Sequence, residues 1–481
     1  MHSASHVRNA GTSLLCGGLA VLFVAGTVGA KAPETKRAGA APASQETLDA
    51  GRELFARSWA PKDPRSHGGD GLGPVFNAQS CVDCHDQGGP GGAGLAERNI
   101  EIATATGGAS SGPGFGYAFH MDFGAGRFEY SFGTGAPREG RREARTERAE
   151  KAERAASALI HPGFRAGRSV VLHRFGTDPE YQTWRATVLG RRGAVRVEIS
   201  ERNPTPLFGA GLIDTIPDEA IEAVARRSVG ASGVRGRVAR LKGGRVGRFG
   251  WKAQTETLEE FALSAAASEV GLEVPGHHQA GDPRLPGIGA AGLDLDRDEC
   301  AALVAYVRAL PAPVELVPAD AKEAARIEAG GATFAAIGCA ACHLPKLGDV
   351  EGIYSDLLLH DMGPKLVDTG SYGVFVARPA GAGGPNAEGG PRGESAGVLV
   401  QEWRTPPLWG VRDSAPYLHD GRAATIGQAI AQHGGQGAAT ARRYASLPTL
   451  RRGQLDAFLQ SLSSPPPEDE RPELSEARRP R

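Results

Sequence analysis

Two stretches, one closing each half of the chain, carry a single apolar stripe at helical spacing. A helix that turns one face toward a hydrophobic core repeats its apolar residues at intervals of three and four positions. Pro311 and Pro465 follow soon after these stretches, and we expect them to end the two helices. The stripes consist of Cys300, Leu303, Val304, Val307 and Leu310 in the first half, and of Leu455, Phe458, Leu459 and Leu462 in the second.

The parts that precede these closing helices recur in the same order in both halves, which indicates an internal duplication. Each half opens with an amphipathic helix, contains a Pro-Leu-aromatic-Gly element and continues with a short helix. We expect the opening helices at 47–57 and 319–337, the Pro-Leu-aromatic-Gly elements at 206–209 and 407–410, and the short helices at 218–227 and 425–433.

Segments around 170–172 and 194–199 alternate apolar and polar residues, and this alternation is typical of β-strands. The pattern therefore predicts an N-terminal domain at 46–311 with an inserted β and loop region at about 106–250. A second domain follows at 312–463. The expected fold is mainly α, with two helical domains, loop-rich connections and a small β-containing insertion in the first half.

Residues 1–30 have the pattern of a secretory signal peptide. Arg8 lies in a short polar head, an apolar run covers 14–24, and small residues at 28–30 form a cleavage site. The apolar run is too short for a membrane-spanning helix. An Ala/Pro-rich linker follows at 31–45, and no second long apolar stretch occurs. We expect an exported, periplasmic protein without stable membrane insertion once the signal is cleaved.

Composition limits the partners and the chemistry. The formal net charge is −1, which gives no electrostatic case for nucleic acid as a partner. The 68 Gly and 33 Pro predict long loops, and 464–481 is expected to be a disordered tail. Cys300 is the one Cys of the mature chain outside two short motifs, so a disulfide framework is not expected and Cys300 is interpreted as a core thiol.

The two short motifs are the pentapeptide Cys-x-x-Cys-His, at 81–85 and again at 339–343. This spacing is typical of covalent c-type haem attachment, in which two thiols add to the vinyl groups of the porphyrin. The adjacent His then binds the iron as its proximal ligand. The sequence therefore predicts two covalently attached haem c groups, held by Cys81, Cys84 and His85, and by Cys339, Cys342 and His343.

A four-thiolate zinc site and a pair of thioredoxin-like redox motifs are the alternatives for two Cys-x-x-Cys sequences. Zinc ribbons usually bring their Cys pairs much closer together in sequence than 81–84 and 339–342. Neither alternative requires a His directly after the second Cys, and both motifs have one. Haem is favoured on that distinction, so both helical domains are expected to be cytochrome c-like.

Around these motifs the chain resembles a family of bacterial di-haem oxidoreductases, named as peroxidases or thiol oxidoreductases and related to the di-haem cytochrome c peroxidases. The resemblance extends from about residue 46 to 463 and depends on the order of several stretches around the two motifs. It implies the fold and the cofactors, whereas the thiol-oxidoreductase label finds no support in the Cys content. The stretches are 71–77 (GLGPVFN), 203–217 (NPTPLFGAGLIDTIP), 247–252 (GRFGWK), 354–364 (YSDLLLHDMGP), 405–410 (TPPLWG) and 417–422 (YLHDGR).

The second axial ligand decides what each iron does, because an open position binds small oxidants and a Met raises the reduction potential relative to a second His. Met362 lies in a polar segment bounded by Gly and Pro, and we expect it to bind the second iron. The resemblance agrees, since related peroxidases give their C-terminal, high-potential haem a Met. Met121 is either an iron ligand or a core residue. His120 is either a ligand or an acid–base group.

Other candidates keep two interpretations each. His67, in a loop before the first motif, either approaches the first haem or lies on the surface. Arg422 either pairs with a haem propionate, as guanidinium groups pair with carboxylates, or is an ordinary surface residue. Trp251 is either a core aromatic or, as the resemblance implies, an electron relay between the haems. The remaining histidines near the second motif receive no role: His360, His419 and His433.

The sequence as a whole predicts an exported di-haem c-type oxidoreductase. Electrons from a soluble donor protein, a small cytochrome or a cupredoxin, would enter at the C-terminal haem and pass to the N-terminal haem, where peroxide or a similar small oxidant is reduced. His120 and His67 are the candidates for the proton transfer that peroxide cleavage needs. Two alternatives stay open. One is a non-catalytic electron carrier, if both methionines bind iron, and the other is a di-haem enzyme with a different substrate.

Overall fold

The computed structural model describes residues 43–107, 151–193, 195–227, 233–285, 289–370 and 400–466. The expected signal peptide, most of the linker, and His120 and Met121 lie outside these ranges. The fold is a mixture of helix and strand, with about 40% of residues helical and 16% in strands, so helix predominates as expected. Within the described ranges no helix combines the length and apolar character that crossing a membrane requires.

The opening and short helices expected from the sequence are present, and their ends lie within two residues of the expected positions. Both closing helices are present as well, and the apolar stripes that predict them are buried. The α-helices are α1 (Gln45–Ala56), α3 (Tyr181–Val188), α4 (Ala210–Thr215), α5 (Asp218–Arg226), α6 (Leu258–Ala265), α7 (Arg297–Ala309), α8 (Ala321–Ile337), α9 (Ile426–Ala431), α10 (Ala438–Ala445) and α11 (Thr449–Ser461).

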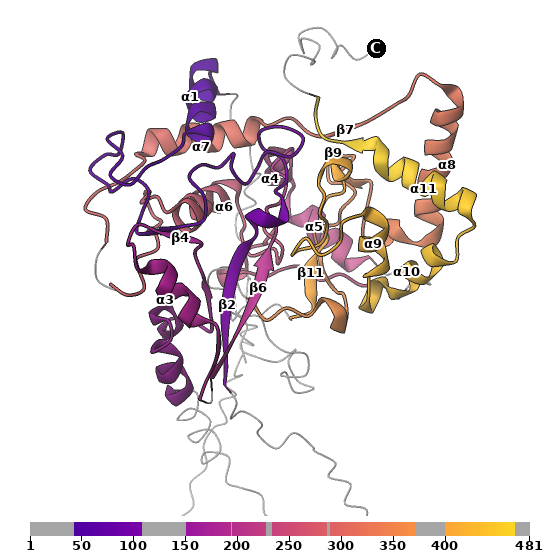
Figure 1. Ribbon diagram of the computed structural model, residues 1–481. Coiled ribbons are helices and arrows are strands. Elements are labelled where there is room, and N and C mark those ends of the chain that lie inside the picture. The colour runs from indigo at the N-terminus through magenta and orange to yellow at the C-terminus, as the bar shows by residue number, and fades with distance from the viewer. Residues whose placement is uncertain are drawn as a thin grey trace, which may run out of the picture. The chain divides into compact units, whose positions relative to one another are not determined.

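The strands expected around 170–172 and 194–199 are present as β3 and β6, in a four-stranded antiparallel sheet with the order β3-β2-β6-β5. The sequence did not predict the strand β2, which begins before the expected insertion. The two long strands of the sheet, β2 and β6, run side by side along their full length (Figure 1). Short two-stranded pairs make up the other β-structure. The strands are β1 (Val75–Phe76), β2 (Ile100–Gly107), β3 (Ser169–Val171), β4 (Phe175–Gly176), β5 (Gly190–Arg192), β6 (Val195–Arg202), β7 (Val314–Glu315), β8 (Lys346–Leu347), β9 (Val350–Glu351), β10 (Leu359–Asp361), β11 (Glu402–Arg404) and β12 (Leu462–Ser463).

In the first half the opening helix α1 packs against the closing helix α7 at a glycine. A Cβ on Gly51 would lie 2.1 Å from the carbonyl oxygen of Ala302, so the missing side chain lets the two backbones touch. One turn along, the rings of Phe55 and Tyr306 meet with their centroids 5.4 Å apart. Close backbone contact and an aromatic pair together fix how these two helices cross.

The second half repeats this crossing between α8 and α11. A Cβ on Gly330 would lie 2.1 Å from the carbonyl oxygen of Gln454. Again one turn along, the rings of Phe334 and Phe458 meet at 5.3 Å. The spacing from glycine to aromatic residue is the same in both opening helices, which is the arrangement that an internal duplication predicts.

Separate groups of buried apolar side chains support the helices and the sheet. Helices α1, α4, α6 and α7 contribute to one core, and α8 and α11 contribute to another. A third group packs on the four-stranded sheet. Cys300 is 5% exposed in the first core, and burial raises the pKa of its thiol to about 12. It is therefore a core residue, as expected from its place in the apolar stripe.

Candidate haem centres

The first Cys-x-x-Cys-His motif lines a cavity of about 1020 Å³. Its backbone turns tightly, because the amides of Cys84 and His85 both donate to the carbonyl of Cys81, at 3.2 and 3.1 Å. This turn brings both thiols and the imidazole to one wall of the cavity. Apolar side chains from α6 and α7, among them Leu258 and Leu303, form much of the remaining wall.

The imidazole of His85 is oriented as an iron ligand requires. Its Nδ1–H donates to the carbonyl oxygen of Gly92 at 3.2 Å, which leaves Nε2 without a proton. Burial lowers the pKa of His85 to about 4, so the ring is neutral at physiological pH. Metal-binding histidines commonly donate their second ring nitrogen to a carbonyl in this way, which fixes the tautomer and the ring orientation.

The second motif repeats this geometry in a larger cavity of about 1640 Å³. The amides of Cys342 and His343 donate to the carbonyl of Cys339 at 3.3 and 3.0 Å. The Nδ1–H of His343 donates to the carbonyl oxygen of Tyr354 at 3.0 Å. Burial is the main cause that lowers the pKa of His343 to about 4, so this ring is also a neutral potential ligand.

Arg404 tests whether the second cavity suits a haem. Its guanidinium is buried in the cavity wall, where Nε donates to the carbonyl of Gly250 at 2.8 Å and Nη1 has no hydrogen-bond partner. Burial lowers the pKa of Arg404 to about 10. A buried cation with an unsatisfied donor is costly unless an anion compensates it. A porphyrin carrying carboxylates, attached to the thiols of the same cavity, meets this requirement, so the residues fit a haem.

The two cavities share part of their walls. Trp251 and the segment Asn203, Pro204 and Thr205 line both of them. The indole Nε1–H of Trp251 donates to the carbonyl of Asn203 at 2.8 Å, which fixes the ring at this wall. Trp251 is therefore not an ordinary core aromatic, because one side chain borders both candidate haem sites.

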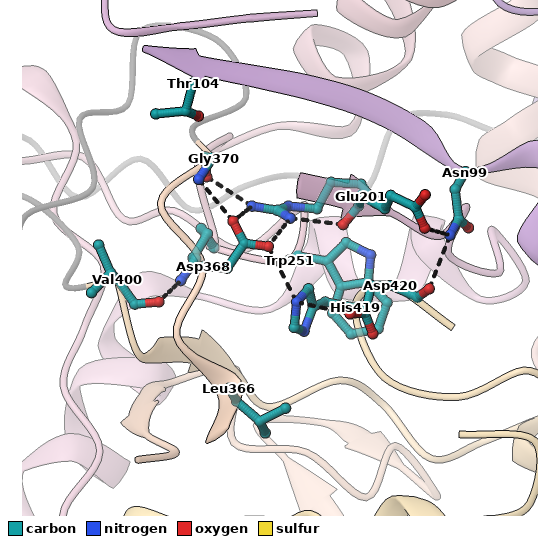
Figure 2. Close-up of polar contacts among 12 residues, drawn as sticks. Asn99, Thr104, Glu201, Trp251, Leu366, Asp368, Gly370, Val400, His419 and Asp420 are labelled. Atoms are coloured by element: carbon teal, nitrogen blue, oxygen red, sulfur yellow. Dashed lines mark hydrogen bonds and ion pairs between the residues drawn. The ribbon is translucent and has the colours of Figure 1, made fainter. Parts of the chain in front are cut away.

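Charged residues linked by polar contacts lie near Trp251 (Figure 2). Arg202, which lines the first cavity, pairs with Asp368. Asp368 also lies 3.2 Å from Nε2 of His419, which lines the second cavity. The His419 ring stacks on Trp403, with the centroids 3.7 Å apart, and lies beside Trp251 in Figure 2. Burial raises the pKa of Asp368, but the contact with His419 and the charge of Arg202 outweigh it and hold that pKa well below its usual range.

Comparison with known proteins adds to this geometry. Residues 382–462 match the family model described as "Di-haem oxidoreductase, putative peroxidase". This match confirms the family resemblance. It supports an oxidoreductase that uses haem, in agreement with the cavities at the two motifs.

Two solved structures are similar to this chain at low identity. One is hydrazine synthase of Kuenenia stuttgartiensis, pressurised with xenon, with 21% identity, coverage of 51% of this chain and 88% of that chain, and a TM-score of 0.24. The other is a MauG-like protein associated with microbial copper homeostasis, with 18% identity, coverage of 52% and 90%, and a TM-score of 0.26. The comparison with curated proteins found no match.

Met362 lines the second cavity together with His343, so these two expected ligands lie at one site. His120 and Met121, expected near the first haem, lie outside the described residues. The structure places His67 elsewhere. Its side chain is 44% exposed, its Nε2 lies 2.8 Å from Glu299, and it lines neither cavity. The surface interpretation of His67 is therefore the one that the structure supports.

Arg422 is also placed away from the cavities. Its Nε donates to Asp420 at 2.6 Å and its Nη1 donates to the carbonyl of Lys365 at 3.0 Å. It lines neither cavity, so the expected contact with a propionate is not supported. The surface interpretation of Arg422 is therefore the one that the structure supports. Arg404, which the sequence did not single out, is the buried arginine in the wall of the second cavity. An Arg in a strand of three residues carries no sequence signal that separates it from other arginines.

Two further residues of the cavity walls were missed, Gln254 and Glu269 of the first cavity. His433, to which the sequence assigned no role, lines the second cavity. Glu269 lies in η4 (Ala266–Val270), a single π-helical turn that continues α6. Such turns are rare and are frequent at functional sites. The available signal was the one charged residue within the stretch 261–272, which is otherwise made of apolar and small residues.

Proposed function

We propose that this protein is an exported di-haem c-type oxidoreductase that reduces peroxide or a similar small oxidant. The substrate would be reduced at a first haem held by Cys81, Cys84 and His85. Electrons from a soluble donor protein would arrive through a second haem held by the motif at 339–343. For hydrogen peroxide, two electrons and two protons convert one molecule into two molecules of water.

The observation that carries this proposal is the difference between the two cavities. Among the described residues that line the first cavity, His85 is the one His and no Met is present. The second cavity brings His433 and Met362 near His343. A haem with two protein ligands suits electron transfer, whereas a haem with an open position can bind a small oxidant. The first site is therefore the candidate for substrate.

Glu269 is the candidate for proton transfer at the first site. The bound haem would supply electrons to the oxidant, and cleavage of the O–O bond also requires a proton at the oxygen that leaves. Glu269 is the one carboxylate among the described residues of this wall. It can accept the proton from the incoming peroxide and return it to the leaving oxygen. This assigns to Glu269 the role expected of His120 or His67.

Trp251 supports an electron route between the two sites. Its indole borders both cavities, and its hydrogen bond to the Asn203 carbonyl holds the ring in place. An aromatic ring fixed at a shared wall shortens each transfer step between the two centres. This position is the one that the family resemblance implies for a Trp relay.

Spectroscopy of the oxidised protein, matured in a host that attaches haem c, tests this function. We expect two covalent haems, one of them high-spin by electron paramagnetic resonance, and a change of that signal when peroxide is added. Two low-spin haems that do not respond to peroxide would instead establish an electron carrier. Absence of covalent haem would overturn the proposal. A high-spin haem that fails to turn over peroxide would direct the search to another substrate.

A further inference from the structure

We propose that His433, and not Met362, would bind the iron of the second haem together with His343. This inference rests on the proposed function, because it requires a haem in the second cavity. It replaces the His–Met pair expected from the sequence with a pair of histidines.

The hydrogen bonding of His433 matches that of both proximal histidines. His433 follows α9, and its Nδ1–H donates to the carbonyl oxygen of Ala429 at 2.8 Å. Nε2 is therefore the unprotonated nitrogen of a ring that lines the cavity. His85 and His343 are held in the same way through Gly92 and Tyr354. Fixing Nδ1 on a carbonyl is how proteins orient a histidine toward a metal.

The rings of His433 and His343 line the same cavity. Each is fixed through Nδ1 on a backbone carbonyl, at 2.8 Å for His433 and 3.0 Å for His343. The cavity therefore holds two imidazoles that are prepared in the same way to bind a metal.

The other histidines of the cavity are already engaged. Both ring nitrogens of His360 have partners, Nε2 with Asp356 at 2.8 Å and Nδ1 with Gln436 at 2.9 Å. Nε2 of His419 lies 3.2 Å from the carboxylate of Asp368 but makes no hydrogen bond with it, and the ring is held by the indole of Trp403 that stacks on it. Neither ring can turn toward an iron without losing these buried contacts. Elimination leaves His433 as the candidate histidine.

Met362 lies beside His433, which explains why the sequence suggested it. A Cβ on Gly437 would lie 3.0 Å from Cβ of His433 and 3.4 Å from Cε of Met362, so both side chains reach the same point. A thioether on a flexible, unbranched chain adapts to the space around it. The imidazole is fixed by a hydrogen bond. We therefore assign His433 as the iron ligand and Met362 as a residue that packs beside it.

This assignment changes the expected energetics of the second haem. A Met ligand raises the reduction potential relative to a second His. With two histidines the second haem would have a lower potential than the His–Met haem that the family resemblance implies. Reduction of this haem would then require an electron donor of correspondingly low potential.

The test compares His433→Ala with Met362→Leu in the haem-loaded full chain, by visible, near-infrared and electron paramagnetic resonance spectroscopy and by redox titration. Met362→Leu nearly conserves volume. We expect it to leave the low-spin signal and the potential of the second haem unchanged. We expect His433→Ala to convert that haem to a high-spin form, which added imidazole returns to low spin. Alternatively Met362 binds the iron of the His433→Ala variant, in which case a thioether-to-iron charge-transfer band appears and the reduction potential of the second haem rises.

The opposite pattern overturns the inference. A thioether charge-transfer band in the unmodified protein, lost in Met362→Leu, would assign the iron to Met362. This measurement needs no His433 variant and therefore decides the question even if His433→Ala fails to mature. Loss of covalent haem from the unmodified protein would instead refute the proposed function, so the two failures are distinguishable.

Discussion

Arg202 and Asp368, 166 residues apart in the chain, form a buried two-pronged ion pair. Nη1 of Arg202 lies 2.6 Å from one carboxylate oxygen and Nη2 lies 3.2 Å from the other. Their side chains are 7% and 6% exposed. Arg202 ends β6 and lines the first cavity. Asp368 lies 3.2 Å from His419, and His419 lines the second cavity. The pair therefore ties together the walls of the two candidate haem sites.

Replacing Asp368 with Asn is expected to destabilise the folded protein by about 3–5 kcal/mol at pH 7, since it leaves a buried guanidinium without its partner. The folded-state pKa of Asp368 is lowered, so its charge contributes stability at pH values above about 4, the ordinary pKa of Asp. That contribution is lost as the pH falls toward the lowered pKa. Urea denaturation of both proteins between pH 7 and pH 3 measures the difference.

The matched control is Glu323→Gln, in an exposed ion pair with Arg326 at 3.2 Å. Exposed pairs contribute about 0–1 kcal/mol, so this variant should shift the denaturation midpoint little at any pH. Equal effects of the two substitutions would show that burial of the Arg202 pair does not matter for stability.

Neighbouring glycines of α8 should respond in opposite directions to Ala. In Gly330→Ala the new Cβ would meet the carbonyl of Gln454 at 2.1 Å, so we expect a loss of about 1–3 kcal/mol from overpacking. In Gly331→Ala the nearest atom is a Phe458 ring carbon at 3.5 Å, an ordinary contact. Ala is the better helix former, so this control should gain about 0.5–1 kcal/mol. Denaturation midpoints of the two variants measure these effects. Similar midpoints would contradict the close contact between α8 and α11 at Gly330.

Cysteine substitutions should separate the two haem sites from the core thiol. Mass spectrometry of the double variants Cys81→Ala/Cys84→Ala and Cys339→Ala/Cys342→Ala should show no covalently attached haem at the altered site, because both of its thioether bonds are gone. Cys300→Ala should keep both haems, since this thiol is 5% exposed in the core of the first half. A full complement of firmly bound haem in all three variants would refute covalent attachment.

Replacing Glu269 with Gln should lower kcat for peroxide about 10²–10⁴-fold, because the amide no longer transfers a proton. The haem spectrum should stay unchanged. His67→Ala should keep near-normal turnover, since His67 pairs with Glu299 on the surface. Steady-state kinetics tests both. Loss of activity in His67→Ala with Glu269→Gln unaffected would restore His67 as the acid–base group.

Trp251→Phe should slow electron transfer between the haems while leaving each haem's own spectrum in place. The phenyl ring is smaller and lacks the Nε1–H that donates to Asn203. Stopped-flow reduction of the oxidised protein follows the transfer. Trp184→Phe is the control, because Trp184 packs on the β-sheet core and lines neither cavity. Equal rates in the two variants would remove Trp251 from the electron route.

The sequence by itself determined the opening, short and closing helices of each half, the presence of β-structure in the first half and the two Cys-x-x-Cys-His motifs. Apolar spacing encodes a helix locally, and a pentapeptide needs only its own backbone turn to bring Cys81, Cys84 and His85 together. The repeated Gly and aromatic spacing of α1 and α8 is also local. These features are read directly because each depends on residues a few positions apart.

Only the tertiary structure decided which other side chains reach the cavities. His67 and Arg422 lie near motifs in sequence but pair with carboxylates elsewhere. Glu269 reaches a cavity wall from a π-helical turn. Arg404 does so from the short strand β11, and His433 from the residues that follow the short helix α9. Whether a charged or coordinating side chain faces a cavity depends on contacts between distant segments, and spacing along the chain does not encode those contacts.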